Sequence, residues 1–511
     1  MPAAHEFSQT PMIPTRLNDV TVLPKQVFLA AIAGLGLRLL FVLGFPASAG
    51  DSALYLQLAR NLADHHAYGL WINGQLIPTD LRMPGYPAFL WGIALLFGRG
   101  LKPILLSQAV IDLCTCVFTG LLAVALAPAA TRRRAAVAGV WLAATCPFVA
   151  DYSAVVLTEV LAAFLSTAAC LCFVLGLTHD AVELSWMGRR AAIPSQAVAC
   201  LGALLSGVAS LVRPEMPLLM AIAGIVLALR WWRILGWRKL ARLGAAMGAV
   251  FLLPLAVWGA RNLVTLHEVQ LLAPRYATLP SEYAPRGYYA WTKTWLARYR
   301  DVYNTLWKIG DEAVETDELP DAAFDSPEEK VRVEALLEQY NSSLNLDLSP
   351  YLDSEFAAIA RERTRRKPLR TYLWVPFQRE LTIWFTPRTE LLPSTAAVWP
   401  IAEHWDENPL DVLVAIFFGL LNYIYVALAL GGIWVAWRAR EASQDAQGAE
   451  SANLWGIALL VVYLASRTIF LTTVEAPEPR YVVPCFPAVL ALAALVWSRT
   501  SRLGGIRHAE S

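Results

Sequence analysis

The sequence predicts an all-α polytopic membrane protein with about ten transmembrane helices, juxtamembrane helices on the outer face and a mainly helical periplasmic insert. Three observations predict this fold class. Hydrophobic residues make up 57% of the 511 residues, whereas charged residues make up only 16%. The mean hydropathy of +0.45 is far above that of soluble chains. Long apolar runs recur along the chain, and clusters of Arg separate them in alternate connections.

The apolar runs bounded by charge are the candidate spans. In chain order they cover residues 27–45, 104–127, 135–150, 155–177, 196–212, 216–229, 243–260, 410–437, 454–473 and 482–497. The first run precedes Ala47-Ser48-Ala49, which resembles a signal-peptidase site. Because this run is about twenty residues long, more than a signal h-region needs, we expect an uncleaved first helix.

The basic clusters predict the orientation of the chain. They lie at residues 132–134, 189–190, 230–242, 438–440 and 499–507, in alternate connections between the runs. By the positive-inside rule these connections and both termini are cytoplasmic, in a bacterial inner membrane. The apolar stretch 86–97 must then stay on the periplasmic side, as a short interfacial or re-entrant helix.

This topology predicts three parts. Residues 1–260 form an N-terminal transmembrane catalytic module that includes a first periplasmic loop, 46–103. Residues 261–409 form a periplasmic cap insert, in which the aromatic stretch 372–385 suits the headgroup interface. Residues 410–511 form the C-terminal transmembrane helices and a cytoplasmic tail.

Several function classes find no support in the sequence. A net charge of +1 gives no basic field for nucleic acid, and all seven cysteines lie in apolar runs. No nucleotide-binding loop or nucleophile elbow occurs in a supporting context. His65-His66 and the cluster 403–407 lack the spacing of a zinc site, so we expect no cofactor, and no motif supports a divalent metal ion.

Charged residues at the edge of a span are costly, which makes those on the outer side candidates for a functional site. They are Asp51, Arg82, Asp151, Glu159, Arg213, Glu215, Arg261, Glu475, Glu478 and Arg480, with Tyr55, Tyr86 and Tyr481 nearby. Two Arg–Tyr pairs, one at 82 and 86 and the other at 480 and 481, follow or contain proline turns. Such pairs are suited to gripping a phosphate, although Arg and Tyr also mark ordinary membrane interfaces.

The remaining candidates have structural alternatives. Asp51 can act as a helix N-cap or as a general base. Arg213 and Glu215 can form a tight hairpin with an internal ion pair, and Glu159 can order helix packing. With Tyr55 and Arg261, these three form the expected supporting or acceptor-side group.

The ordered set of motifs resembles the GT-C superfamily of membrane glycosyltransferases. It consists of Gly50-Asp51-Ser52 with Tyr55, then Arg82-Met83-Pro84-Gly85-Tyr86-Pro87, Arg213-Pro214-Glu215, residues 258–262 and residues 478–484. The likeness is closest to the bacterial branch related to protein O-mannosyltransferases, lipid A aminoarabinose transferases and Rgt-type galacturonosyl transferases. The insert between Arg275 and Asp406 resembles no subgroup of that superfamily.

The resemblance implies an inverting transfer from a polyprenyl-monophosphate sugar to a hydroxyl of a glycan, lipid or protein at the periplasmic face. It implies Asp51 as the general base, and Arg480 and Tyr481 as ligands of the donor phosphate. Ser52 stands where the branch commonly has a second acidic residue, and Glu159 or Glu215 is expected to replace it. The alternatives are a transporter or flippase and a noncatalytic polysaccharide-assembly subunit; a transporter is expected to show repeated halves, which this sequence lacks.

Overall fold

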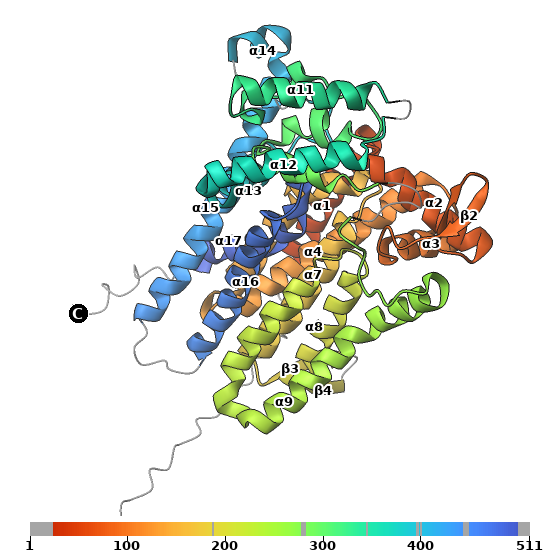
Figure 1. The fold of residues 1–511 in the computed structure, drawn as a ribbon. Coiled ribbons are helices and arrows are strands. Elements are labelled where there is room, and N and C mark those ends of the chain that lie inside the picture. The colour runs from red at the N-terminus through yellow and green to blue at the C-terminus, as the bar shows by residue number, and fades with distance from the viewer. Residues whose placement is uncertain are drawn as a thin grey trace, which may run out of the picture.

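A computed structural model describes residues 24–186, 189–276, 283–343, 346–394, 398, 401–442 and 449–498 of the chain. In this part a bundle of long helices carries a helical insert at one end (Figure 1). The strands form two hairpins, β1–β2 (Gly69–Ile72 and Gln75–Pro78) and β3–β4 (Ala181–Trp186 and Arg189–Pro194). The predicted all-α polytopic fold is confirmed.

Seven helices in the described ranges are long and apolar enough to cross a membrane, and one bent pair makes an eighth. The seven lie in α1 (Pro24–Gly44), α4 (Leu101–Leu126), α7 (Glu159–Thr178), α9 (Pro217–Leu266), α15 (Pro409–Ala442), α16 (Ala449–Leu471) and the stretch Pro479–Ser498, which contains α17 (Phe486–Ala494). The bent pair, α5 (Arg132–Ala144) and α6 (Pro147–Ala150), turns by 53°.

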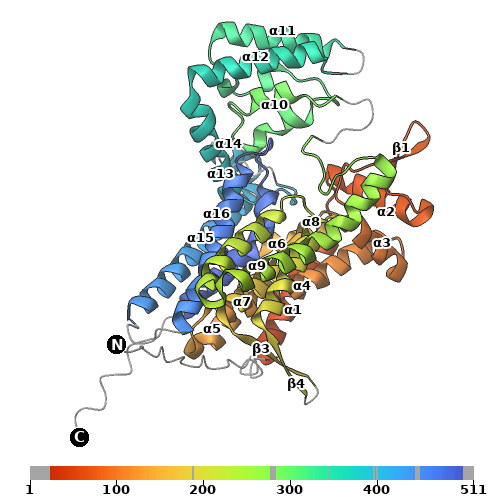
Figure 2. The same cartoon turned by 60° about the horizontal axis from the view of Figure 1, so that its bottom comes forward.

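This number, based on helix length and composition, is lower than the expected ten, although each of the ten expected runs lies in a helix or in the bent pair. The runs 216–229 and 243–260 are counted together in α9, but Gly236, with φ of 70° and ψ of 161°, breaks α9 into two helices, one for each run. Glycine allows this backbone conformation because it lacks a Cβ atom. The run 196–212 becomes α8 (Ser195–Ser210), whose 16 residues are fewer than the roughly 20 of a typical span, yet α8 leads from the β3–β4 hairpin at one end of the bundle to Arg213 in the cavity wall at the other (Figure 2).

The two ends of the bundle differ in their connections. The insert helices α10 (Arg286–Thr292), α11 (Pro327–Asn341) and α12 (Pro350–Arg366) lie at one end, and the β3–β4 hairpin lies at the other (Figure 2). The bend of α9 lies at the hairpin end in Figure 1, and α5 lies towards the same end in Figure 2. The membrane orientation of this axis stays a prediction, and the basic cluster 499–507 and both chain ends lie outside the described residues.

The segment after α1 builds one side of the insert end. It contains α2 (Gly50–His65), the β1–β2 hairpin and α3 (Gly85–Phe97), which lies beside α2. At 13 residues, α3 is too short to cross a bilayer. The Gly85 amide donates to the Leu211 carbonyl at 2.7 Å, and a Cβ atom at Gly85 would lie 2.6 Å from that oxygen. Glycine at this position therefore lets α3 dock against the turn that carries Arg213.

The insert has a core of its own that includes Tyr288, Trp291, Leu337, Tyr340 and Phe356. The chain then returns to the bundle through α13 (Val375–Phe385), in which Ile383 is buried in the main core. A short helix, α14 (Ile401–Glu407), precedes α15. The part boundaries at residues 260 and 409 stay a prediction.

Candidate functional site

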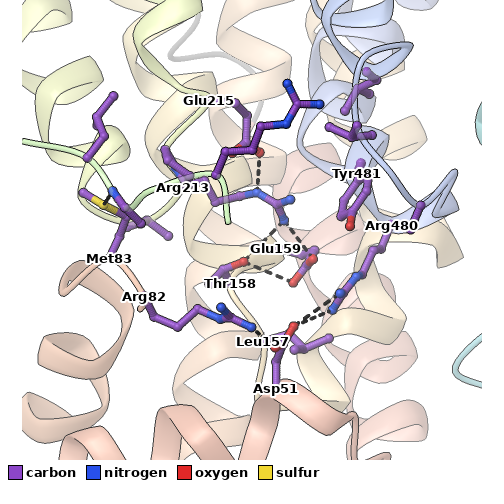
Figure 3. A pocket seen from close by; sticks show the side chains of 18 of the residues that line it. Asp51, Arg82, Met83, Leu157, Thr158, Glu159, Arg213, Glu215, Arg480 and Tyr481 are labelled. Carbon is purple, nitrogen blue, oxygen red and sulfur yellow. Dashed lines mark hydrogen bonds and ion pairs between the residues drawn. The ribbon is translucent and has the colours of Figure 1, made fainter. Parts of the chain in front are cut away.

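A cavity of about 560 Å³ opens at the insert end of the bundle (Figure 3). Seven separate stretches of chain contribute to its wall, so that residues from both halves of the sequence meet there. The charged and phenolic side chains that line it are Asp51, Tyr55, Arg82, Glu159, Arg213, Glu215, Arg275, Glu475, Arg480 and Tyr481.

Asp51 lies in the first turn of α2, and its carboxylate does not cap the helix. The helix begins at Gly50, and Ala49 is its N-cap. The backbone N–H of Ala49 donates to Ser52 Oγ at 3.2 Å, so Ser52 provides the capping contact. The expected N-cap role for Asp51 therefore does not apply, and its side chain points into the cavity.

Two arginines from opposite ends of the chain hold the Asp51 carboxylate (Figure 3). Arg82 Nη2 donates to Oδ1 at 2.7 Å, and both terminal nitrogens of Arg480 donate to Oδ2 at 3.2 Å. Burial raises the pKa of the Asp51 carboxyl, but the two guanidinium groups hold it below its ordinary value. In this state Asp51 is an ionised and stabilised carboxylate.

Glu478 organises the second Arg–Tyr pair. Arg480 Nε lies 2.5 Å from Glu478 Oε2, and the Tyr481 hydroxyl donates to Glu478 Oε1 at 2.9 Å. Both partners follow Glu478 in a short 3₁₀ segment, Pro479–Cys485, that leads into α17. The proline turn therefore aims the guanidinium and the phenol at one place, as the sequence indicated.

A second ionic network lies beside this pair. Arg213 donates to Glu215 at 2.6 Å and to Glu159, the first residue of α7, at 2.9 Å. Arg467 of α16 donates to Glu215 at 3.1 Å and to the Tyr481 carbonyl at 2.8 Å. Burial raises the pKa of Glu215, but Arg213 and Arg467 outweigh this effect and lower the pKa to about 2.

Arg467 was missed from the sequence because it lies inside the apolar run 454–473 rather than at its edge. A single arginine within an otherwise uncharged spanning run is itself a signal, since a charge at that depth needs a partner. Here the partner is Glu215.

Glu475 connects the rim of the cavity to the insert. Its carboxylate accepts from Lys293 at 2.6 Å, from Arg275 at 3.0 Å and from the Tyr276 hydroxyl at 2.8 Å. Burial raises the Glu475 pKa, but Lys293 leads a set of donors that lowers it below its ordinary value. Of these four residues, only Glu475 was a candidate from the sequence. Its partners lie about 180 to 200 residues away along the chain, where no local pattern marks them.

Two of the predicted site tyrosines, Tyr86 and Tyr55, pack against each other but differ in their position relative to the cavity. Tyr86 is fully buried, packs edge-on against Tyr55 at 5.1 Å and donates to Gln108 Oε1 at 2.6 Å. Its hydroxyl therefore faces α4, and Tyr86 is not among the residues that line the cavity, whereas its expected contact with a phosphate stays a prediction. Tyr55 does line the cavity, and burial, reinforced by Asp51, raises its pKa to about 12.

Arg261 also lies away from the cavity. It donates to the Thr79 carbonyl at 3.0 Å and to Asn262 at 2.8 Å, and its guanidinium lies over the Trp258 ring at 4.9 Å. These contacts anchor the end of the β1–β2 hairpin to α9. Arg261 and the buried Asp151 both lie outside the cavity wall, and the acceptor-side role expected for Arg261 stays a prediction.

The cavity wall balances its charges. Four arginines face it, at positions 82, 213, 275 and 480, together with four carboxylates, at positions 51, 159, 215 and 475. An entering anion must therefore take an arginine from a carboxylate that now holds it. Among the described residues, no group of three or more His, Cys, Asp or Glu side chains is placed to hold a metal ion.

No family model matches the chain, and no curated protein matches it either. Solved structures similar to it include an Archaeoglobus fulgidus oligosaccharyltransferase (14% identity, TM-score 0.44, 92% of this chain and 48% of that chain). Others are ArnT from Cupriavidus metallidurans bound to undecaprenyl phosphate (14%, 0.38, 92% and 77%) and arabinosyltransferase EmbB from Mycobacterium smegmatis (14%, 0.36, 96% and 42%).

These three are GT-C membrane glycosyltransferases, the superfamily that the motifs resemble. The chain spans about half the length of the oligosaccharyltransferase. At these identities and TM-scores the likeness adds no weight to an assignment of function.

Proposed function

We propose that the chain is an inverting glycosyltransferase that moves a sugar from a polyprenyl-monophosphate donor to a hydroxyl of a glycan, lipid or protein acceptor. The observation that carries the proposal is the Asp51 carboxylate, held between Arg82 and Arg480 in a cavity where spanning helices end. Asp51 supplies the base, and Arg82 and Arg480 supply the cations that a phosphate leaving group requires.

The proposed reaction is a single displacement. The acceptor hydroxyl gives its proton to Asp51, and its oxygen attacks the anomeric carbon of the sugar. The bond from that carbon to the phosphate oxygen breaks, and polyprenyl phosphate leaves with the electron pair. Arg480 and Arg82 stabilise the negative charge that develops on the phosphate, and attack from the opposite face inverts the anomeric centre.

Donor binding and base activation are coupled in this scheme. Because Arg82 and Arg480 now neutralise Asp51, a phosphate that binds them takes over part of their hydrogen bonds. The pKa of Asp51 then rises towards its ordinary value, since it loses cationic partners and gains an anionic neighbour. Asp51 thus becomes a stronger base only when the donor is in place.

The other residues position these groups. Glu478 fixes Arg480 and Tyr481, and the phenol of Tyr481 is the second donor-phosphate ligand. Glu159, Arg213 and Glu215 form the acceptor-side wall together with Tyr55. Tyr86 acts behind Tyr55 as packing support and not as a ligand.

The proposal places the cavity at the periplasmic face of a bacterial inner membrane, with both termini in the cytoplasm. Support comes from the bundle itself, because the basic connections at residues 132–134, 189–190 and 230–242 lie at the end opposite the insert. A cysteine at Val331 of α11 should accordingly react with an impermeant maleimide from the periplasmic side only.

The test of the transfer reaction is Asp51→Asn in membranes supplied with a labelled polyprenyl-phosphate sugar and envelope acceptors. We expect transfer to fall by about a thousandfold, the loss typical of a missing general base. The matched control is Asp64→Asn, on the same helix, whose carboxylate pairs with Arg99 at the surface. Transfer by the Asp51 variant at the rate of the control would refute the proposal.

A further inference from the structure

An exposed aromatic and aliphatic patch lies on the segment that returns from the insert to the bundle. It consists of side chains that are 42% to 71% exposed within thirteen residues, namely Leu369, Tyr372, Leu373, Trp374, Phe377 and Leu381. Four of them, at positions 369, 373, 377 and 381, recur every four residues, as on one face of a helix. We refer to these six residues as the aromatic patch.

The opposite face of the same segment is tightly packed. Val375, Arg379 and Ile383 of α13 are at most 3% exposed. Arg379 Nε donates to the Leu296 carbonyl of the insert at 2.7 Å, and its Nη1 donates to the Val474 carbonyl at 2.8 Å. One face of α13 is therefore fixed to the insert and to the cavity rim, while the other face carries the patch outward.

The end of α13 is joined to the outer parts of the spanning helices. The Trp384 indole donates to Thr468 of α16 at 3.1 Å, and the Phe385 ring stacks on Tyr423 of α15 at 5.2 Å. Asn422 of α15 also donates to the Trp384 carbonyl. Tyr423 lies about four turns into α15, which begins at Pro409, so α13 ends at a level where α15 has become an apolar spanning helix.

The patch is continuous with a surface that faces lipid in a spanning helix. At the level of this junction, α15 exposes Phe417, Leu420 and Tyr423, each more than half exposed. Phe385 packs on Tyr423, and Leu381 and Phe377 lie about one and two turns before Phe385 in α13, on the side towards the insert. A water-facing location would leave these neighbouring apolar faces hydrated, which is unfavourable.

The charge at the start of the patch suits phospholipid headgroups. Arg365, Arg366 and Lys367 precede it and are exposed, and of these Arg366 pairs with Glu329 and Lys367 with Asp325. Basic residues beside amphipathic aromatics are typical of segments that lie in the headgroup region.

We propose that the aromatic patch docks on the outer-leaflet surface of the bilayer, with its side chains at the boundary between headgroups and acyl chains. The bilayer thereby holds α13 from one side while Arg379 holds the cavity rim from the other. This contact does not depend on the transfer reaction proposed above.

The experiment is a depth measurement on the full chain in lipid nanodiscs of phosphatidylcholine with phosphatidylglycerol. A bimane fluorophore is attached at Phe377→Cys in a Cys114→Ala background, which removes the exposed native cysteine. Controls carry the same fluorophore at Val331→Cys, which is 64% exposed on α11 of the insert, and at Leu420→Cys on α15. Quenching by nitroxide lipids labelled at the headgroup or the upper acyl chain is compared with quenching by aqueous iodide.

We expect the nitroxide lipids to quench the probe at position 377 several-fold more than the probe at 331, with the headgroup label as the stronger quencher. The probe at 420 should respond most to the acyl-chain label, and the probe at 331 to iodide alone. Iodide quenching at 377 equal to that at 331 would overturn the proposal. Protection of 377 from both quenchers would also overturn it, because a protein partner would then cover the patch.

Discussion

Asp51 and Arg480 lie 429 residues apart in the sequence, yet both terminal nitrogens of Arg480 donate to one oxygen of Asp51 at 3.2 Å. Arg82 holds the other oxygen, so the carboxylate occupies the position that an incoming anion needs. The proposed base and the proposed anion-binding groups therefore neutralise one another before any substrate arrives, and experiments can test the two roles separately.

The first prediction concerns binding of polyprenyl phosphate without chemistry. Asp51→Asn should bind it about tenfold more tightly than the unsubstituted protein, because the neutral amide no longer competes for the guanidinium groups. Arg480→Ala should bind it at least about tenfold more weakly, since a charge-assisted contact is lost. Calorimetric titration of the purified protein measures both, with Asp64→Asn as the control.

An unchanged affinity in both variants would mean that the phosphate does not share these arginines. Because titration requires no acceptor and no transfer, this result separates the anion-binding role of the arginines from the base role of Asp51.

The second prediction concerns pH. The proposed transfer requires an ionised Asp51, so activity should be lost as the pH falls through the pKa of Asp51. In the free enzyme that pKa lies below the ordinary value, owing to Arg82 and Arg480, so the acid limb of kcat/KM should lie at low pH. The acid limb of kcat reports the donor-bound enzyme and should lie at higher pH. Coincident limbs would argue against base activation by the donor.

The third prediction concerns the buried network around Glu215. Glu215→Gln removes the negative charge that Arg213 and Arg467 share, and it leaves a guanidinium buried in α16 without a counter-ion. Breaking such a pair typically costs about 3 kcal/mol. The variant should therefore melt at a lower temperature than Glu334→Gln, an exposed control on α11. Equal melting temperatures would show that the network adds nothing to stability.

The fourth prediction tests the position of Tyr86. Tyr86→Phe removes the donor to the buried Gln108 oxygen and should lower stability by about 1–3 kcal/mol. The affinity for polyprenyl phosphate should not change, because Tyr86 does not line the cavity. Thermal unfolding and calorimetric titration check the two halves. A tenfold loss of affinity with unchanged melting would restore Tyr86 as a phosphate ligand.

Much of the architecture follows from the sequence because apolar length and local charge are local properties. Composition alone identified the runs that form α1, α4, α7, α15 and α16. The length of α3 excluded it from the predicted spans. The sequence also separated the runs 216–229 and 243–260, and Gly236 breaks α9 between them. The charges at positions 51, 82, 213, 215 and 480 stood out because they lie at the edges of apolar runs.

The sequence by itself therefore determined a polytopic helical protein and most of the charged residues of its cavity. Only the tertiary structure decided that Arg82 and Arg480 share Asp51, that Arg467 completes the Glu215 network and that Lys293 reaches Glu475 from the insert. It also decided that Tyr86 turns towards Gln108. The physical reason is that a charge in an apolar setting must find a partner, but which partner it finds depends on how distant helices pack.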